Sequence, residues 1–145
     1  MMKTRIIRIG LVFGILFFAG CEEKVEKPSA DFHFEITDPN EGTVVMQEPY
    51  QVNVNEEFTI VSDNEADFNS FWPGDIVYSR DTIIRVYTPS PTINHQGIKI
   101  GDDGTAKYSY ATSGTYTFTF VSVNANAGAE IMEIATKTGT ITVVE

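Results

Sequence analysis

The sequence predicts an all-β fold, an antiparallel β-sandwich. From Ala30 onward apolar residues recur at every second position, which is the period of a strand with one buried face. Clusters of Gly, Pro, Asn and Asp interrupt these segments at short intervals, as turns between strands do. No segment offers a convincing amphipathic helix. These three observations favour two packed antiparallel sheets.

The first predicted strand opens the domain. Phe32, Phe34 and Ile36 alternate with polar residues, and the segment ends at the turn 38–42. The number and length of the predicted strands are typical of a sandwich that is immunoglobulin-like in broad architecture. The further strands are expected at 43–46, 50–54, 58–62, 67–72, 82–87, 106–110, 115–123, 130–136 and 139–144.

The strongest strand signal lies at 115–120, where aromatic residues alternate with threonines. Tyr116, Phe118 and Phe120 share one face, which we expect to lie in the core. From Val121 the apolar residues pass to the other face. The sequence therefore predicts either a β-bulge or burial on both faces at this point.

Residues 1–20 form a predicted secretory signal peptide. Lys3, Arg5 and Arg8 precede a short apolar run, and small residues end it. The run is too short to span a bilayer, which needs about 20 apolar residues. We therefore expect the mature chain to be anchored and not to span the membrane.

Cys21 is the only cysteine of the chain and directly follows Ala19 and Gly20. This ending resembles a bacterial lipobox, in which the cysteine takes a diacylglyceryl group and the signal is cleaved before it. An unpaired cysteine in an exported chain also indicates a reactive or modified thiol. The resemblance implies lipidation of Cys21 and a stable anchor of two or three acyl chains. The alternative is an ordinary signal peptide that ends near a small residue.

Residues 21–29 are expected to form a solvated acidic tether, because they are highly charged and lack aromatic residues. An acidic stretch after a lipidated cysteine resembles the export signal of surface lipoproteins in Bacteroidota. That resemblance implies an outer-membrane location, with the domain facing the cell exterior. The alternative is a generic acidic spacer.

The composition excludes one class of partner. Removing residues 1–20 leaves 125 residues, enough for one domain at 30–145 with a real core. The signal peptide takes 3 of the 10 Lys and Arg residues, so 7 remain against 20 Asp and Glu, a formal net charge of −13. Such a surface repels polyanions, and we expect no nucleic-acid partner.

Several short segments resemble polycystic kidney disease (PKD) domains. Tyr110, Gly114 and Tyr116, followed by alternating apolar residues up to Phe120, are similar to the late-strand signature of that family. The resemblance spans nearly the whole domain and implies a PKD-like β-sandwich. The other matching segments are 30–32, 57–60 and 139–144.

The chain departs from the PKD pattern in mid-domain. PKD domains carry Trp-Asp-Phe-Gly-Asp there, whereas this chain has Phe-Trp-Pro-Gly-Asp at 71–75. The variant looks more like a group of PKD-like domains of unknown function in Bacteroidota surface lipoproteins, often associated with glycan uptake. That resemblance implies an accessory binding or spacer role and no known reaction, since a fold alone does not establish a function.

Candidate catalytic groups are few. Only His33 and His95 would titrate near neutral pH, and both are interpreted as surface histidines. No Gly-x-Ser-x-Gly elbow accompanies the serines. Two carboxylates that meet across loops, as in glycosidases, are an alternative that sequence spacing does not test.

Several acidic residues are candidate calcium ligands. Oxygen-bearing side chains alternate from Asp63 onward, as in an EF-hand loop, but Phe68 stands where that loop requires glycine. A looser calcium site would draw on Asp63, Asp67, Asp75 or the pair 102–103. Turn-forming, solubilising acids are the favoured interpretation, and we expect no metal or other cofactor.

The adjacent rings of Phe71 and Trp72 are the leading binding candidates. Neighbouring strand residues face opposite sides of a sheet, so without a bulge only one of the two rings is expected in the core. The other would stack on a sugar, with Tyr78 and Tyr87 as companions. The alternative is that all four rings are packing residues.

From these patterns we expect a non-catalytic surface lipoprotein, an accessory module that binds glycan or another surface lipoprotein. The first alternative is a structural spacer or assembly module of an envelope complex. The second is a hydrolase with carboxylates supplied by separate loops.

Overall fold

The computed structural model describes residues 24–80, 84–86, 92–94, 97–126, 128 and 130–145. The predicted signal peptide and Cys21 lie outside this part of the chain. Within it no helix is long and apolar enough to cross a membrane. The strands are β1 (Phe32–Asp38), β2 (Gly42–Val45), β3 (Tyr50–Asn53), β4 (Phe58–Ser62), β5 (Phe68–Trp72), β6 (Ile84–Val86), β7 (Thr92–Asn94), β8 (Ile98–Lys99), β9 (Thr105–Tyr108), β10 (Gly114–Ala125) and β11 (Met132–Val144).

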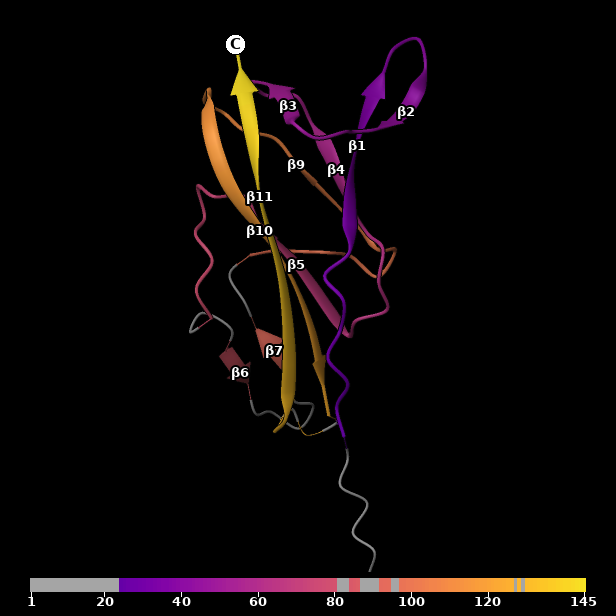
Figure 1. Ribbon diagram of the computed structural model, residues 1–145, viewed down its shortest axis with the longest axis vertical. Coiled ribbons are helices and arrows are strands. Elements are labelled where there is room, and N and C mark those ends of the chain that lie inside the picture. Colours follow the sequence, from indigo (N-terminus) through magenta and orange to yellow (C-terminus); the bar gives the residue numbers. More distant parts are fainter. Residues whose placement is uncertain (1–23, 81–83, 87–91, 95–96, 127, 129) are drawn as a thin grey trace, which may run out of the picture.

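The strands form two principal sheets and one small ribbon (Figure 1). Sheet A has the order β2-β1-β4-β9, and sheet B has the order β3-β11-β10-β5-β8, while β6 pairs only with β7. The strand pairs are antiparallel except for β3, which runs parallel to the end of β11. The predicted all-β class with two sheets, consistent with a β-sandwich, is confirmed.

The core between the two sheets is largely aromatic. Phe34 of β1 is fully buried and meets five other rings, all in edge-to-face geometry with centroids 4.9–5.6 Å apart. Such pairs add about 0.5–1.5 kcal/mol each beyond the burial of their area. The five rings are those of Phe32, Tyr50, Phe58, Phe71 and Phe118.

Two predicted strands, 130–136 and 139–144, are one continuous strand, β11. Gly139 lies within it, directly opposite Phe118 of β10. A Cβ atom at Gly139 would lie only 2.6 Å from Cζ of Phe118, so the glycine makes room for the ring. Strands β7 and β8 were not predicted, because each is too short for an alternating pattern to be visible.

The phase change at Val121 has a clear structural cause. Strands β10 and β11 pair without interruption from Gly114 opposite Val143 to Ala125 opposite Met132, so there is no bulge between them. Both strands extend past the lower end of sheet A in Figure 1. Around Val121 both faces of β10 are buried, which confirms the second of the two sequence-based options.

The described part of the predicted tether does not extend freely into solvent. Residues 24–29 have no regular structure, yet Val25 and Pro28 are half-buried. The side-chain amide of Asn124, near the end of β10, donates a 3.0 Å hydrogen bond to the carbonyl oxygen of Glu26. The chain therefore reaches β1 along the lower end of the sandwich (Figure 1).

Candidate functional site

The two aromatic candidates at the end of β5 are both buried. Phe71 is 0% exposed in the core between the sheets, and Trp72 is 1% exposed on the opposite face of sheet B. The expectation that one ring is exposed is wrong for this pair. It assumed a sheet with only one covered face, whereas sheet B is covered on both faces at this position.

The cover over Trp72 comes from the chain that follows β5. The ring of Tyr78 lies 5.5 Å from the indole in edge-to-face geometry. A Cβ atom at Gly97 would lie 2.6 Å from the indole Cε2, so only glycine fits against this ring. Tyr78 is half-buried, and its burial raises the pKa of its hydroxyl. Tyr87, the fourth aromatic candidate, lies outside the described residues.

The turn after Trp72 is fastened to the opposite sheet. The hydroxyl of Tyr110 donates a 2.7 Å hydrogen bond to the carbonyl oxygen of Pro73, and the hydroxyl of Tyr108 donates to the carboxylate of Asp75. Burial is the main cause that raises the pKa of both hydroxyls, so they stay protonated and keep donating. Tyr108 and Tyr110 thus tie this turn to β9 and to the residues that follow it.

The calcium candidates are distributed over different contacts. The carboxylate of Asp63 binds His33, and that of Asp67 accepts a 2.9 Å hydrogen bond from the backbone N–H of Ala125. Asp75 accepts from Tyr108, as described above. No group of three or more metal-ligating side chains occurs in the ranges that the structure describes. The pair 102–103 lies in the turn between β8 and β9.

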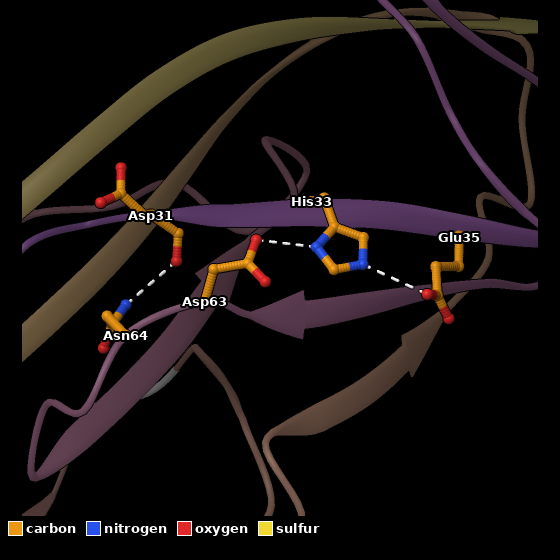
Figure 2. Close-up of polar contacts among 5 residues, drawn as sticks. All are labelled: Asp31, His33, Glu35, Asp63 and Asn64. Carbon is orange, nitrogen blue, oxygen red and sulfur yellow. Dashed lines mark hydrogen bonds and ion pairs between the residues drawn. The ribbon is translucent and has the colours of Figure 1, made fainter.

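His33 lies between two carboxylates on the solvent side of sheet A (Figure 2). Its Nδ1 is 2.7 Å from an oxygen of Asp63, and its Nε2 is 3.2 Å from an oxygen of Glu35. Ionised carboxylates only accept hydrogen bonds, so this geometry needs a proton on both nitrogens. The hydrogen bond to Asp63 is the largest cause that raises the pKa of His33. With both nitrogens protonated, the ring has no free lone pair for base catalysis. His95 lies outside the described residues.

A polar layer closes the lower end of the sandwich beneath the aromatic core. The side-chain amide of Asn64 donates to the carbonyl oxygen of Asp31 at 3.1 Å (Figure 2) and to Oγ of Ser122 at 3.2 Å. The hydroxyl of Ser122, which is fully buried, donates a 2.6 Å bond to Oδ1 of Asn69. These contacts fix the loop between β4 and β5 against the inner face of β10 and β5.

A surface pocket of about 370 Å³ adjoins this polar layer. The loop between β4 and β5 and the turn between β8 and β9 form its walls, and it brings together Asp67 and Asp102 from the two loops. No pattern in the sequence had predicted this pocket. The available signal was the phase change at Val121, which places Ser122 and Asn124 on the inner face, where Phe118 and Phe120 lie further up the strand.

The sequence matches no known family model, and neither curated proteins nor solved structures give a match to the chain.

Proposed function

We propose that the chain is a lipid-anchored protein of the bacterial outer membrane, with a non-catalytic β-sandwich at residues 30–145 that binds glycan or a partner protein. The anchor rests on Cys21 and on the basic and apolar pattern before it. The docked segment 24–29 supports it, because that segment leads the chain away from one end of the sandwich (Figure 1).

Two features support an immunoglobulin-like, PKD-like identity for the sandwich. One is the placement of the early strands: β1 belongs to sheet A, and β3 runs parallel to the last strand, β11, in sheet B. The other is a tyrosine corner: Tyr116 of β10 donates a 2.9 Å hydrogen bond to the carbonyl oxygen of Thr112, four residues upstream. Phe118 follows Tyr116 by two residues and lies in the core, where antibody domains place a cysteine.

The observation that carries the binding role is the polar pocket between the loops that follow β4 and β8. The aromatic rings that the sequence offered as a binding platform are packing residues or lie outside the described residues, so a ligand would have to be recognised by polar groups. The pocket combines amide, hydroxyl, ammonium and carboxylate groups within one concave surface. In many ligand sites, a small number of convergent polar groups on a concave surface fix the orientation of the ligand.

A spacer role is the second candidate, and one observation favours it. The C-terminus lies at one end of the long axis, and the N-terminal segment leaves at the other (Figure 1). A module with this arrangement would keep a partner that binds its far end at a distance from the membrane. The spacer role predicts that the pocket binds no small molecule.

Metabolic labelling with a fatty-acid probe tests the anchor. We expect the wild-type protein to be labelled and recovered in the outer-membrane fraction. The Cys21→Ser variant should remain unlabelled and unprocessed, because the thioether nucleophile is absent. Equal labelling of the two proteins would overturn the lipoprotein assignment.

Incubation of the same protein with a panel of nitrophenyl glycosides tests the absence of catalysis. We expect no release of nitrophenol above the rate in buffer. Turnover that is lost in an Asp67→Asn, Asp102→Asn double variant would overturn the non-catalytic assignment and favour the hydrolase.

A further inference from the structure

The pocket beside the polar layer is built by loops that are fixed to each other. The backbone N–H of Ser62, at the end of β4, donates a 2.9 Å hydrogen bond to the carbonyl oxygen of Gly104. Within the turn, Gly104 donates to Gly101 at 2.9 Å, and Gly101 donates to the carbonyl of Thr105 at 2.8 Å. Because backbone contacts fix both walls, a ligand would meet a largely preformed site.

Ser62 supplies the first specific feature of this pocket. Its Oγ is buried and has no hydrogen-bond partner, and it is the only such side-chain atom in the described part of the chain. A buried hydroxyl without a partner is costly, and native structures normally satisfy it. Ser62 lines the pocket, so a group that enters the pocket is a candidate partner for this hydroxyl.

Asn69 supplies the second feature. Its Oδ1 accepts the hydroxyl proton of Ser122, and this 2.6 Å bond fixes which end of the amide faces the network. The Nδ2 group donates to no protein atom in the described residues, although Asn69 lines the pocket. The buried Ser122 thus orients an amide with two unused donors.

The charged groups of the pocket have both signs. Lys99 of β8 lines one side and has no ion-pair partner among the described residues. Asp102 lies in the turn that follows, and Asp67 lines the pocket from the other loop, where its carboxylate also accepts a hydrogen bond from the backbone N–H of Ala125. The two carboxylates would repel a simple anion, and the ammonium group would partly offset their attraction for a divalent cation. A neutral ligand that both donates and accepts hydrogen bonds suits this mixture.

We propose that the pocket binds a single ring of a neutral polyhydroxylated ligand, a sugar residue. Every sugar hydroxyl is both a donor and an acceptor, so it can satisfy Ser62 and Asn69 and also meet Lys99 and Asp102. The volume of about 370 Å³ lies at the small end of the range for ligand sites, which limits the pocket to about one ring and its substituents. This inference rests on the proposed binding function and assigns its site and ligand class.

The test uses the full chain, purified in a detergent that has no sugar headgroup. Methyl glycosides of glucose, galactose, mannose and N-acetylglucosamine are titrated into the ¹⁵N-labelled protein, with free glycine and inorganic phosphate as comparison probes. For ligands of about a dozen heavy atoms we expect saturable binding in the millimolar range. The amide signals of Lys99, Gly101 and Gly104 should shift with at least one glycoside.

Two variants locate the site. Ser62→Ala removes the unpartnered hydroxyl, so it should weaken glycoside binding about fivefold or more without lowering the melting temperature. Lys99→Met should weaken binding to a similar extent. Lys107→Met, on exposed β9 and away from the pocket, is the matched control and should bind like the wild type.

Each other outcome overturns the inference. No glycoside binding, or binding that both variants leave unchanged, would remove the sugar site from this pocket. Tighter binding of glycine or phosphate than of every glycoside would assign the pocket to an ionic ligand. None of these results affects fatty-acid labelling at Cys21, so the failure of this inference is distinguishable from the failure of the anchor.

Discussion

The two faces of sheet B bury apolar side chains against different partners. On the inner face, Phe71, Phe118 and Phe120 join a cluster of twelve buried residues that includes the rings of sheet A. On the outer face, Trp72 and Val121 belong to a cluster of only three buried residues. The described chain that covers the outer face includes Tyr78 and Gly97, which belong to no strand of either principal sheet.

The polarity of the two faces is exchanged along β10. In its upper part the inner residues are Phe118 and Phe120, and the outer residues are threonines. Beyond Val121 the outer residues are apolar, and the inner residues Ser122 and Asn124 bind Asn69, Asn64 and the N-terminal segment. Which face of a strand is buried therefore depends on what covers it at each position. The polar inner layer exists because the aromatic core ends there.

The largest expected effect is on the inner cluster. Phe118 is 1% exposed and contacts the rings of Phe32, Phe34 and Phe71, so Phe118→Ala should cost about 3–5 kcal/mol of unfolding free energy. A domain has about 5–15 kcal/mol in total, so we expect a large fall in the denaturant midpoint. Thr117→Ala, on the exposed face of the same strand, is the control and should cost less than about 1 kcal/mol. Equal midpoints for the two variants would show that the inner cluster does not dominate stability.

The outer cluster is tested through Trp72, the only tryptophan of the chain. Because its indole is buried, its fluorescence should resist quenching by acrylamide in the folded state and become accessible on unfolding. Trp72→Ala should cost about 3 kcal/mol, the low end for a buried tryptophan, because fewer buried groups surround it. Trp72→Phe retains part of the packing and should lose less. Free quenching in the folded protein, or a Trp72→Ala variant as stable as the wild type, would show that the outer face is uncovered.

The sequence predicted the class of fold well because alternation reports directly on strands with one buried face. Phe32, Phe34, Phe118 and Phe120 follow the period of two and lie in the core. The pattern failed at the adjacent pair Phe71 and Trp72, where both rings are buried. The cover over Trp72 comes from residues that have no period of their own, so alternation gave no indication of it.

The pocket was harder to predict, for a related physical reason. Three different strands supply Ser62, Asn69 and Lys99. They come together only because β5 pairs with β8 and because the end of β4 contacts the turn between β8 and β9. None of them belongs to a local motif. Aromatic residues were the more visible candidates in the sequence, and the core required them instead.

The hydrogen bonds that join the two sheets offer a smaller effect. Tyr110→Phe keeps the buried ring but leaves the carbonyl oxygen of Pro73 without its partner, so it should cost about 1–2 kcal/mol. Tyr116→Phe removes a hydroxyl that bonds at the exposed position of Thr112, and it should cost about 0.5–1 kcal/mol. Chemical denaturation of both variants measures the difference. If Tyr116→Phe proved the more costly of the two, the turn after Trp72 would not depend on its bond to the opposite sheet.

The smallest expected effect is the pH dependence that His33 confers on the solvent side of sheet A. The folded-state pKa is raised above the unfolded value of 6.5, mainly by the hydrogen bond to Asp63, so folding favours the protonated form. This contribution is fully present below pH 6.5 and is lost as pH rises through the folded-state pKa. The side chain is 30% exposed, so solvent screening keeps the effect small.

Denaturant midpoints should therefore fall slightly as pH rises above 6.5, and the His33→Gln variant should show no such fall. The surface pair Lys107–Glu57 contains no histidine, so Lys107→Gln is the control and should keep the wild-type slope. A slope that His33→Gln leaves intact would show that His33 does not hold its proton between the two carboxylates.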